Sequence, residues 1–453
     1  MTCSWFSLRI SVLLAILPAA APAQPASQPA SQPVGCFIGY GGGSAEARTP
    51  GFHKLIYQWT ENGQIRYVPF SIFIPQGYGT DERRWPLLTF LAGLGDRGAD
   101  PGAGMAVGVP LEIGRSEELA KWLPMIVLTP QCPSDKVWDM PGMSRDVLRL
   151  IHAVSSRFAV DASRLYITGF SDGGKGSWVL AADEPGLFAV AAPVVSREYN
   201  ADETAARLAG SNITCLVISG MKDPKSEPAS AHMVDAVRRQ GVDVVYAPVP
   251  DAEHFIWRAF YSQKAFYEWL LLHRRGQPTP KDRAASQGIV ELYSSRQQLS
   301  RGQQVFEYQM QRSLNLFEPY WFIDNCGQSA MVGLKPHLQG RRKVYVTISL
   351  SADIPCRLQT TRQLPKDKWT DLLLEVGHPP QGEWELVVRV NEQEVAHTLV
   401  NDQTAPDGWM KIKVSLRPYA GKEARLQLIQ RATWHRPTAG YWASVNLTET
   451  NPQ

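Results

Sequence analysis

The sequence predicts an α/β fold with a mostly parallel sheet covered by helices, followed by an all-β sandwich domain. From about residue 64, apolar strand-like runs alternate with stretches of helical periodicity, as a parallel sheet requires. After the Gly/Pro-rich residues 276–280, the runs resemble short strands separated by turn residues, which indicates a sandwich. The 453 residues, 44% of them hydrophobic, suffice for two or three globular domains.

Each element of the first domain follows from its local pattern. In residues 144–157, Val147, Leu150, Ile151 and Val154 recur every three or four positions and form one apolar helical face. The remaining expected helices are residues 176–182, 230–240 and 262–272. The expected strands are residues 67–74, 87–91, 125–129, 165–168, 188–194, 213–219 and 244–249, then 343–350, 369–376, 384–390, 410–416 and 424–429 in the second domain.

The N-terminus has the pattern of a secretory signal peptide over residues 1–23. Arg9 precedes the apolar run 10–17, and Ala21-Pro22-Ala23 provides a small-x-small cleavage site. Residues 24–34 are a Pro/Ser-rich linker, so we expect a secreted or periplasmic protein. The apolar run is too short to span a bilayer and no later run is long enough, so no membrane span is expected.

The net charge and the cysteines limit which binding partners, disulfides and metal sites are expected. The formal net charge of +3 gives no indication of nucleic acid as a partner. Five cysteines follow the signal peptide, so at least one has no partner within the chain. Cys215 lies in an apolar run and is expected to be a buried thiol, whereas Cys326 and Cys356 share a domain and form a candidate pair. No Cys-x-x-Cys motif or His-rich cluster occurs, so we expect no metal site and no cofactor.

The motif Gly169-Phe170-Ser171-Asp172-Gly173 carries the strongest chemical signal. It follows a strand-like run and precedes a helix-like run, the context of a nucleophile elbow. Gly169 and Gly173 remove side chains that would collide at so sharp a turn. The alternative is an ordinary glycine-rich loop, but the strand–turn–helix context favours Ser171 as a nucleophile.

A serine nucleophile needs a base and a carboxylate that orients the base. Asp223 follows the run 213–219, and His254 follows the run 244–249, which gives the order Ser, acid, His. Asp223 alternatively starts a turn before a proline. Asp251 and Glu253 are rival acids, but they share the loop of His254. The remaining histidines of the domain lie in helix-like segments or before the sheet: His53, His152, His232 and His273.

Two backbone N–H groups are candidates for stabilising a developing oxyanion. One is that of Asp172, directly after the nucleophile. The other is that of Leu94, in the Gly-rich loop 91–98 after the strand 87–91, where Gly93 shapes the turn. The alternative for this loop is a simple glycine-rich turn.

These residues resemble secreted α/β-hydrolases of the polyhydroxybutyrate depolymerase-like and feruloyl/acetyl-xylan esterase-like group, including a branch often labelled "predicted peptidase". The resemblance covers about residues 55–275 and implies an α/β-hydrolase fold, with nucleophile, acid and base at Ser171, Asp223 and His254. The motifs that carry it are Trp85 and Pro86 with residues 87–91, running into Gly93, Gly95, Asp96, Arg97 and Gly98; residues 129–133; Asp161, Arg164, Leu165 and Tyr166; the elbow; and Gly176 with Trp178.

The chain departs from this group at two positions. The group usually has histidine where Ala92 stands, so loop support is expected to be weaker here. It often has an apolar residue where Asp172 stands, and a carboxylate there opposes a developing negative charge unless it points away or is paired, for example with Lys175.

The second domain looks like a galactose-binding-type jelly roll over residues 409–416, 419–422, 424–429 and 440–445. Such domains bind carbohydrate or only brace a catalytic domain. Six tryptophans are candidates both for stacking on sugars and for the core: Trp321, Trp369, Trp384, Trp409, Trp434 and Trp442.

The sequence as a whole predicts an exported serine carboxylic-ester hydrolase that forms an acyl-enzyme, with a small-molecule or polymeric ester, such as an acylated polysaccharide, as substrate. The alternatives are a serine peptidase of the same fold and an inactive hydrolase fold that binds glycans. The expected domains are residues 35–275 for the hydrolase, 276–288 for a linker and 289–453 for the sandwich.

Overall fold

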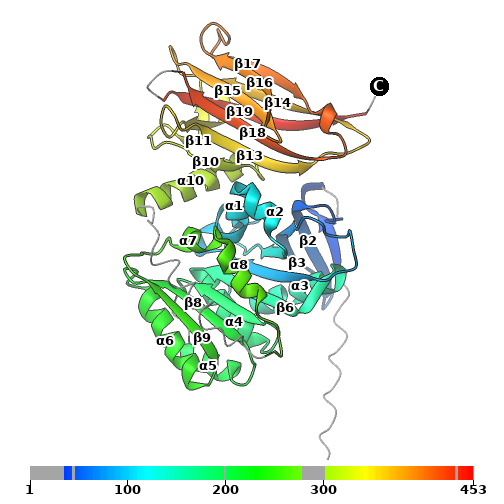
Figure 1. The fold of residues 1–453 in the computed structure, drawn as a ribbon, viewed down its shortest axis with the longest axis vertical. Helices are drawn as coiled ribbons and strands as arrows, with labels where there is room; N and C mark the ends of the chain where they lie inside the picture. The colour runs from blue at the N-terminus through cyan, green and yellow to red at the C-terminus, as the bar shows by residue number, and fades with distance from the viewer. Residues whose placement is uncertain (1–34, 43–45, 198–199, 278–300, 434–436, 452–453) are drawn as a thin grey trace, which may run out of the picture. The chain divides into compact units, whose positions relative to one another are not determined.

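The computed structural model describes residues 35–42, 46–197, 200–277, 301–433 and 437–451 (Figure 1). Residues 35–453 form one compact unit. The expected signal peptide and Pro/Ser-rich linker, and most of the expected interdomain linker, lie outside the described residues.

A nine-stranded sheet organises the first part of the chain, in the order β1-β2-β3-β5-β4-β6-β7-β8-β9. The first three strands pair antiparallel, and the six from β4 to β9 run parallel to one another. This mostly parallel sheet confirms the predicted fold class. The strands are β1 (Cys36–Gly39), β2 (Gly51–Glu61), β3 (Gln64–Ile74), β4 (Trp85–Leu91), β5 (Ile126–Pro130), β6 (Val160–Phe170), β7 (Val190–Val194), β8 (Thr214–Gly220) and β9 (Asp243–Val249).

Helices cover both faces of this sheet (Figure 1). One apolar cluster packs α3 (Met143–Arg157), α4 (Asp172–Asp183), α5 (Ala201–Leu208) and α6 (Ser226–Arg239) against one face. The predicted apolar face of α3 is confirmed, because its four residues are fully buried there. A second cluster packs α1 (Gly108–Arg115), α2 (Glu117–Trp122), α7 (Trp257–Tyr261) and α8 (Lys264–Leu271) on the other face.

The hairpin β2–β3 was not expected from the sequence. Asn62 and Gly63 have φ values of 51° and 74°, the left-handed conformation that a tight two-residue hairpin turn needs. Since β2 belongs to the sheet, the expectation that His53 lies before the sheet is wrong: His53 is on β2, paired with Ile72 of β3.

The second part of the chain begins with a helix, α10 (Arg301–Phe317), where only short strands were expected. Two five-stranded antiparallel sheets follow, in the orders β10-β13-β18-β15-β16 and β11-β12-β19-β14-β17, and enclose a common apolar core. The strands are β10 (Phe322–Asp324), β11 (Gly333–Leu338), β12 (Arg341–Ile348), β13 (Cys356–Gln363), β14 (Trp369–Gly377), β15 (Trp384–Val390), β16 (Gln393–Val400), β17 (Trp409–Ser415), β18 (Glu423–Ala432) and β19 (Ala439–Thr450). The predicted β-sandwich is therefore present.

Most of the candidate sugar-stacking tryptophans belong to the sandwich core. Trp321, Trp384 and Trp442 are almost completely buried, and Trp409 is also buried. Trp369 is half-buried, and the Arg417 guanidinium lies 3.8 Å from the centre of its ring. Trp434 lies outside the described residues. The burial of four of these indoles agrees with their reading as core residues.

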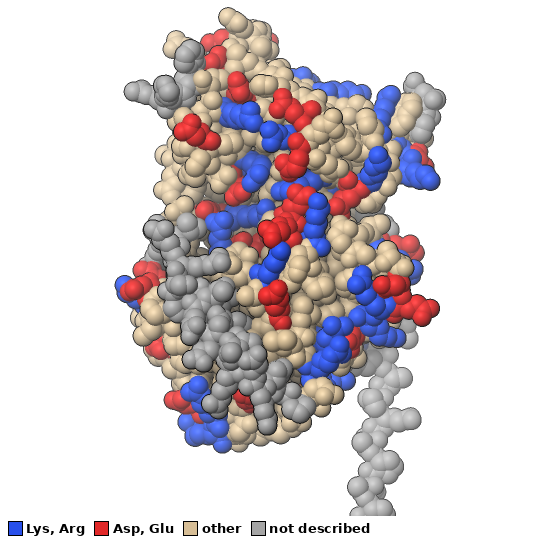
Figure 2. All heavy atoms as spheres, in the orientation of Figure 1, with Lys and Arg blue, Asp and Glu red and all other residues tan. Residues whose placement is uncertain are grey.

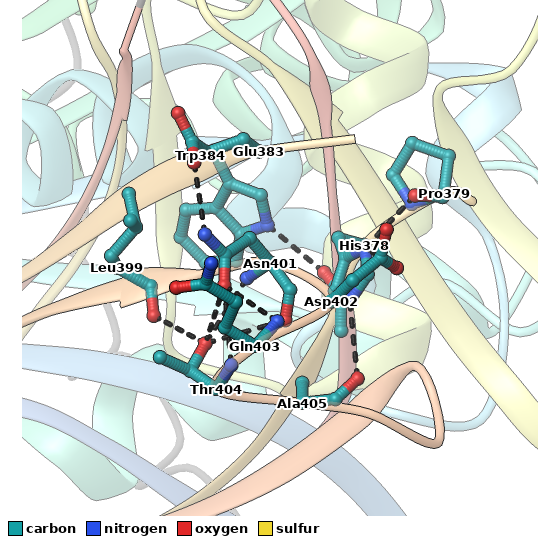
Figure 3. A network of polar contacts seen from close by, with 11 residues as sticks. His378, Pro379, Glu383, Trp384, Leu399, Asn401, Asp402, Gln403, Thr404 and Ala405 are labelled. Atoms are coloured by element: carbon teal, nitrogen blue, oxygen red, sulfur yellow. Dashed lines mark hydrogen bonds and ion pairs between the residues drawn. The ribbon is translucent and has the colours of Figure 1, made fainter. Parts of the chain in front are cut away.

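A polar network closes the turn between β16 and β17 (Figure 3). Asn401 Oδ1 accepts hydrogen bonds from the N–H groups of Gln403 and Thr404, at 3.0 and 3.1 Å. Buried His378 lies between two carbonyl oxygens, with Nδ1 2.8 Å from that of Pro379 and Nε2 3.3 Å from that of Ala405. The network satisfies backbone groups of the turn itself, so we assign it a structural role.

The cysteines agree in part with the expectation. Cys215 is a buried thiol, and its burial raises its pKa. Cys326 and Cys356 lie against each other and share a hydrogen bond, but both are free thiols in the structure. The suggested disulfide between Cys326 and Cys356 is therefore not present in the structure.

Candidate active site

Ser171 occupies a strained turn between β6 and α4. Its backbone dihedrals are φ 59° and ψ −113°, outside the regions that a non-glycine residue usually adopts. A Cβ added at Gly169 would lie 2.1 Å from the carbonyl oxygen of Gly173, and one at Gly173 would lie 1.8 Å from that of Leu91. Only glycine fits at both positions, so the tight turn predicted from the sequence is present.

His254 and Asp223 meet Ser171 at this turn, although they come from different loops. His254 Nε2 lies 2.9 Å from Ser171 Oγ, and His254 Nδ1 lies 2.5 Å from Asp223 Oδ2. Asp223 follows β8 and His254 follows β9, so parallel pairing of neighbouring strands places both loops at the same edge of the sheet. The structure thus brings together the three residues that the sequence analysis singled out.

Asp223 is held so that one oxygen faces the histidine. Its Oδ1 accepts hydrogen bonds from the N–H groups of Lys225 and Ser226, at 3.1 and 3.3 Å. Burial by itself would raise the pKa of Asp223, but the hydrogen bonds from His254, Ser226 and the Lys225 N–H outweigh burial and lower it. The carboxylate is therefore ionised at neutral pH.

Asp251, a rival acid in the sequence analysis, points elsewhere. Its exposed carboxylate forms an ion pair with Lys222, at 2.7 Å. Asp223 is the carboxylate that contacts Nδ1 of His254. Of the other histidines, His152 lies on α3 and contacts Glu184, and His273 is buried just beyond α8.

The candidate oxyanion donors lie at two helical turns. Asp172 begins α4, so its N–H has no acceptor within the helix. Leu94 begins the 3₁₀ turn η2 (Leu94–Asp96), which is separated from the end of β4 by two residues. A Cβ at Gly93 would lie 3.2 Å from the Phe170 ring, so this loop packs closely against the residue before Ser171. Such N–H groups are suited to an oxyanion.

Side chains that the sequence analysis did not identify hold the loop at Ala92. The Trp138 indole N–H donates to the Ala92 carbonyl oxygen at 2.8 Å. Gln131 Nε2 donates to the Asp96 carbonyl oxygen at 2.9 Å, and Arg97 Nε donates to that of Leu94 at 2.9 Å. These hydrogen bonds support the loop in this chain, which has alanine rather than histidine at position 92.

Asp172 is buried, and its carboxylate is directed toward Trp138. Burial raises its pKa, while the charge of Lys175 and a hydrogen bond from the backbone N–H of Trp138 oppose the rise. Lys175 itself forms an ion pair with Asp139, at 2.6 Å. The charge of Lys175 thus favours the ionised carboxylate of Asp172, as suggested from the sequence, and Lys175 also pairs with Asp139.

Aromatic rings enclose the imidazole of His254. The Phe170 and Phe255 rings lie 5.2 and 5.7 Å from it, centre to centre. Phe255 in turn lies 6.0 Å from the ring of Tyr308, on α10. Beside Phe255 is a cavity of about 360 Å³ whose lining includes Arg258 and Glu307. The apolar rings cover part of the imidazole, and a less polar environment strengthens hydrogen bonds.

Two further observations concern the described residues only. They contain no group of three or more His, Cys, Asp or Glu side chains that could hold a metal ion. Of the helices in the described ranges, none is long and apolar enough to cross a membrane.

Similarity to known proteins was found among solved structures alone. No protein-family model matches the chain, and no curated protein does. Similar structures include a thermostable esterase (25% identity, TM-score 0.42, 49% of this chain and 63% of that chain). They also include a ferulic acid esterase (17%, 0.38, 49% and 97%) and the Pyrococcus horikoshii acylaminoacyl peptidase (11%, 0.38, 51% and 50%). The chain thus spans just under two thirds of the thermostable esterase. At these TM-scores, the function must be argued from this chain's own geometry.

Proposed function

We propose that the chain is a serine hydrolase that cleaves carboxylic esters through Ser171, His254 and Asp223. The observation that carries this proposal is the continuous hydrogen-bonded series from Ser171 Oγ through both imidazole nitrogens to Asp223, at 2.9 and 2.5 Å. A serine hydroxyl is a weak nucleophile, and this arrangement supplies both the base and the carboxylate that orients it.

The mechanism follows from the positions of these atoms. His254 Nε2 takes the proton of Ser171 Oγ as the oxygen attacks the ester carbonyl carbon. The N–H groups of Asp172 and Leu94 stabilise the oxyanion that forms. The protonated imidazole then gives its proton to the leaving alcohol, which leaves an acyl group on Ser171. Water, deprotonated by His254, releases the acid and restores the serine.

The central experiment compares wild type with Ser171→Ala in hydrolysis of p-nitrophenyl acetate and butyrate, using residues 24–453. We expect turnover that falls at least about 10⁴-fold in the variant, together with covalent labelling of wild type by a fluorophosphonate. Ser230→Ala is the matched control, because this buried hydroxyl on α6 has no hydrogen-bond partner in the structure. Equal rates in wild type and Ser171→Ala, without labelling, would refute the proposal in favour of an inactive fold.

The substrate class and the location extend the proposal. We propose an acylated polysaccharide as a substrate to test after the small esters, using acetylated and feruloylated xylans. Four of the six candidate tryptophans are buried in the described part of the sandwich, and we propose that the hydrolase part recognises the substrate. We also propose that residues 1–23 direct export, and N-terminal sequencing of exported protein should begin at Gln24. A product that starts at Met1 would contradict export by cleavage.

A further inference from the structure

Helix α10 contacts different parts of the chain with its two faces. Met310, Leu314 and Phe317 are buried in the core of the sandwich. Tyr308 and Asn315 lie on the other face, seven residues apart and therefore two turns along the helix. Asn315 Nδ2 donates to the carbonyl oxygen of Gly102, which lies in the α/β part of the chain, at 2.8 Å. The helix thus binds the sandwich with one face and the hydrolase part with the other.

Further polar contacts fix this helix on the hydrolase part. Glu307 forms ion pairs with Arg258 of α7 and with Arg115 of α1, the second at 3.4 Å. From the sandwich itself, Gln359 Nε2 donates to the carbonyl oxygen of Arg115 at 2.8 Å. Acidic and basic side chains are interspersed over the face of the molecule shown in Figure 2. The ion pairs of Glu307 and the hydrogen bond of Gln359 together hold α10 in one position against the active-site loops.

Tyr308 reaches the loop that carries the candidate oxyanion donor Leu94. Its hydroxyl donates a hydrogen bond to Asp96 Oδ1 at 2.7 Å. The same hydroxyl would lie 2.7 Å from a Cβ at Gly95, so it rests directly on the backbone of η2. The ring contacts Phe255, next to His254 in the chain. One side chain therefore touches both the loop that carries Leu94 and the loop that carries His254.

We propose that Tyr308 is a positioning residue of the hydrolase: it holds η2 through Asp96, so that helix α10 completes the active site. This inference rests on the proposed function. Asp96 is only 3% exposed, and a buried carboxylate needs hydrogen-bond donors. Without the tyrosine hydroxyl, the Asp96 carboxylate loses a hydrogen-bond donor and is more stable when turned toward water. The three-residue turn η2, which includes Leu94, then moves with it.

The electrostatics of the pair agree with this role. Burial raises the pKa of Asp96 to about 6, and the Tyr308 hydrogen bond and the Arg312 charge oppose the rise. Burial and the nearby Asp96 charge raise the pKa of Tyr308, so its hydroxyl remains protonated and is the donor. Arg312 lies one turn after Tyr308 on α10, so the same helical face supplies both stabilising groups.

The test compares Tyr308→Phe with Tyr345→Phe. Tyr345 donates to the carbonyl oxygen of Met310 on the same helix at 2.8 Å, but from inside the sandwich. In Tyr308→Phe we expect kcat for p-nitrophenyl butyrate to fall about tenfold, with KM within about twofold of wild type. Inhibition by an aryl boronic acid, whose tetrahedral serine adduct uses the oxyanion donors, should weaken by about the same factor. Tyr345→Phe should leave all three unchanged.

An unchanged kcat in Tyr308→Phe would overturn the inference. So would a higher KM with unchanged kcat, which is the result for a residue that binds substrate, or an equal loss in Tyr345→Phe. Amide hydrogen exchange separates this inference from the proposed function, because it needs no substrate. Tyr308→Phe should speed exchange in residues 94–97. Unchanged exchange there removes the positioning role, whereas an inactive, unlabelled wild type removes the proposed function.

Discussion

A methyl group added at Gly173 tests how tightly the turn at Ser171 is packed. The added Cβ would lie 1.8 Å from the Leu91 carbonyl oxygen and 2.8 Å from that of Ala92. Both are backbone atoms at the end of β4 and the start of the oxyanion loop, so no side-chain rotation relieves the collision. In Gly173→Ala, the first turn of α4 and this loop must move apart.

The expected size of the effect follows from these distances. An ordinary carbon–oxygen contact is about 3.3 Å, so the backbones must separate by about 1.5 Å. Glycine to alanine within a helix otherwise stabilises by at most about 1 kcal/mol. Overpacking costs up to about 3 kcal/mol, and here it acts on backbone that cannot yield, so we expect a net loss of at least about 2 kcal/mol. A displacement of about 1 Å between catalytic groups lowers the rate about 100-fold.

The assay measures the free energy of unfolding in urea and kcat for p-nitrophenyl butyrate. Gly302→Ala on α10 is the matched control, because nothing lies within 4 Å of an added Cβ there. We expect the control to retain wild-type stability and activity. A Gly173→Ala protein within about 0.5 kcal/mol of wild type and with kcat within about threefold would refute the steric argument.

Two further predictions concern carboxylates. Asp223→Asn replaces the carboxylate that accepts from His254 Nδ1 with an amide, which favours the wrong imidazole tautomer. We expect kcat to fall about 10³- to 10⁴-fold with little change in KM, as measured by steady-state kinetics. A loss of kcat below about tenfold would contradict the role assigned to Asp223. Folding raises the pKa of Asp96 from 3.8 to about 6, so the folded state binds this proton more tightly and stability falls as pH rises from about 4 to about 6. The loss is about 3 kcal/mol. Asp96→Asn should lack this pH-dependent contribution. Urea unfolding at pH 4 and pH 7 measures it: an equal change in unfolding free energy between the two pH values for wild type and variant would contradict the prediction.

The sequence predicted the elements around Ser171 because their signals are local. The elbow needs glycines at fixed offsets from Ser171, and those offsets are visible in the chain. The positions of Asp223 and His254 follow from a general property of parallel sheets, that loops at the carboxyl ends of strands share one edge. The sequence favoured Asp223 over Asp251, because Asp251 shares the loop of His254, and the side-chain directions in the structure agree with that preference.

Other elements had local signals that the sequence analysis did not use. In β2, Leu55, Tyr57 and Trp59 alternate with less buried residues, which is the period of a strand. The Asn62-Gly63 pair that follows is a strong signal for a hairpin. In α10, Phe306, Met310, Leu314 and Phe317 recur every three or four residues, as in a helix. Expecting a sandwich throughout the second part concealed this helix.

The contact between Tyr308 and Asp96 had no signal in the sequence. The two residues are 212 positions apart and lie in parts of the chain with different secondary structure. Their pairing depends on how the sandwich packs against the hydrolase part, which local periodicity does not encode. The hydrogen bonds from Gln131 and Trp138 also have no signal in the sequence, because each residue contacts a loop that is distant from it along the chain.

The strand order of the sandwich also bears on how the protein assembles during synthesis. α10 packs on β11 and β12, and β12 pairs with β19, which also pairs with β14. A nascent chain can therefore close the sheet beneath α10 only after β19 has been synthesised. We therefore expect the contact of Tyr308 with its partner loop to be secured only once this last strand is in place. Loss of β19 would disturb the Ser171 region without altering any residue in it.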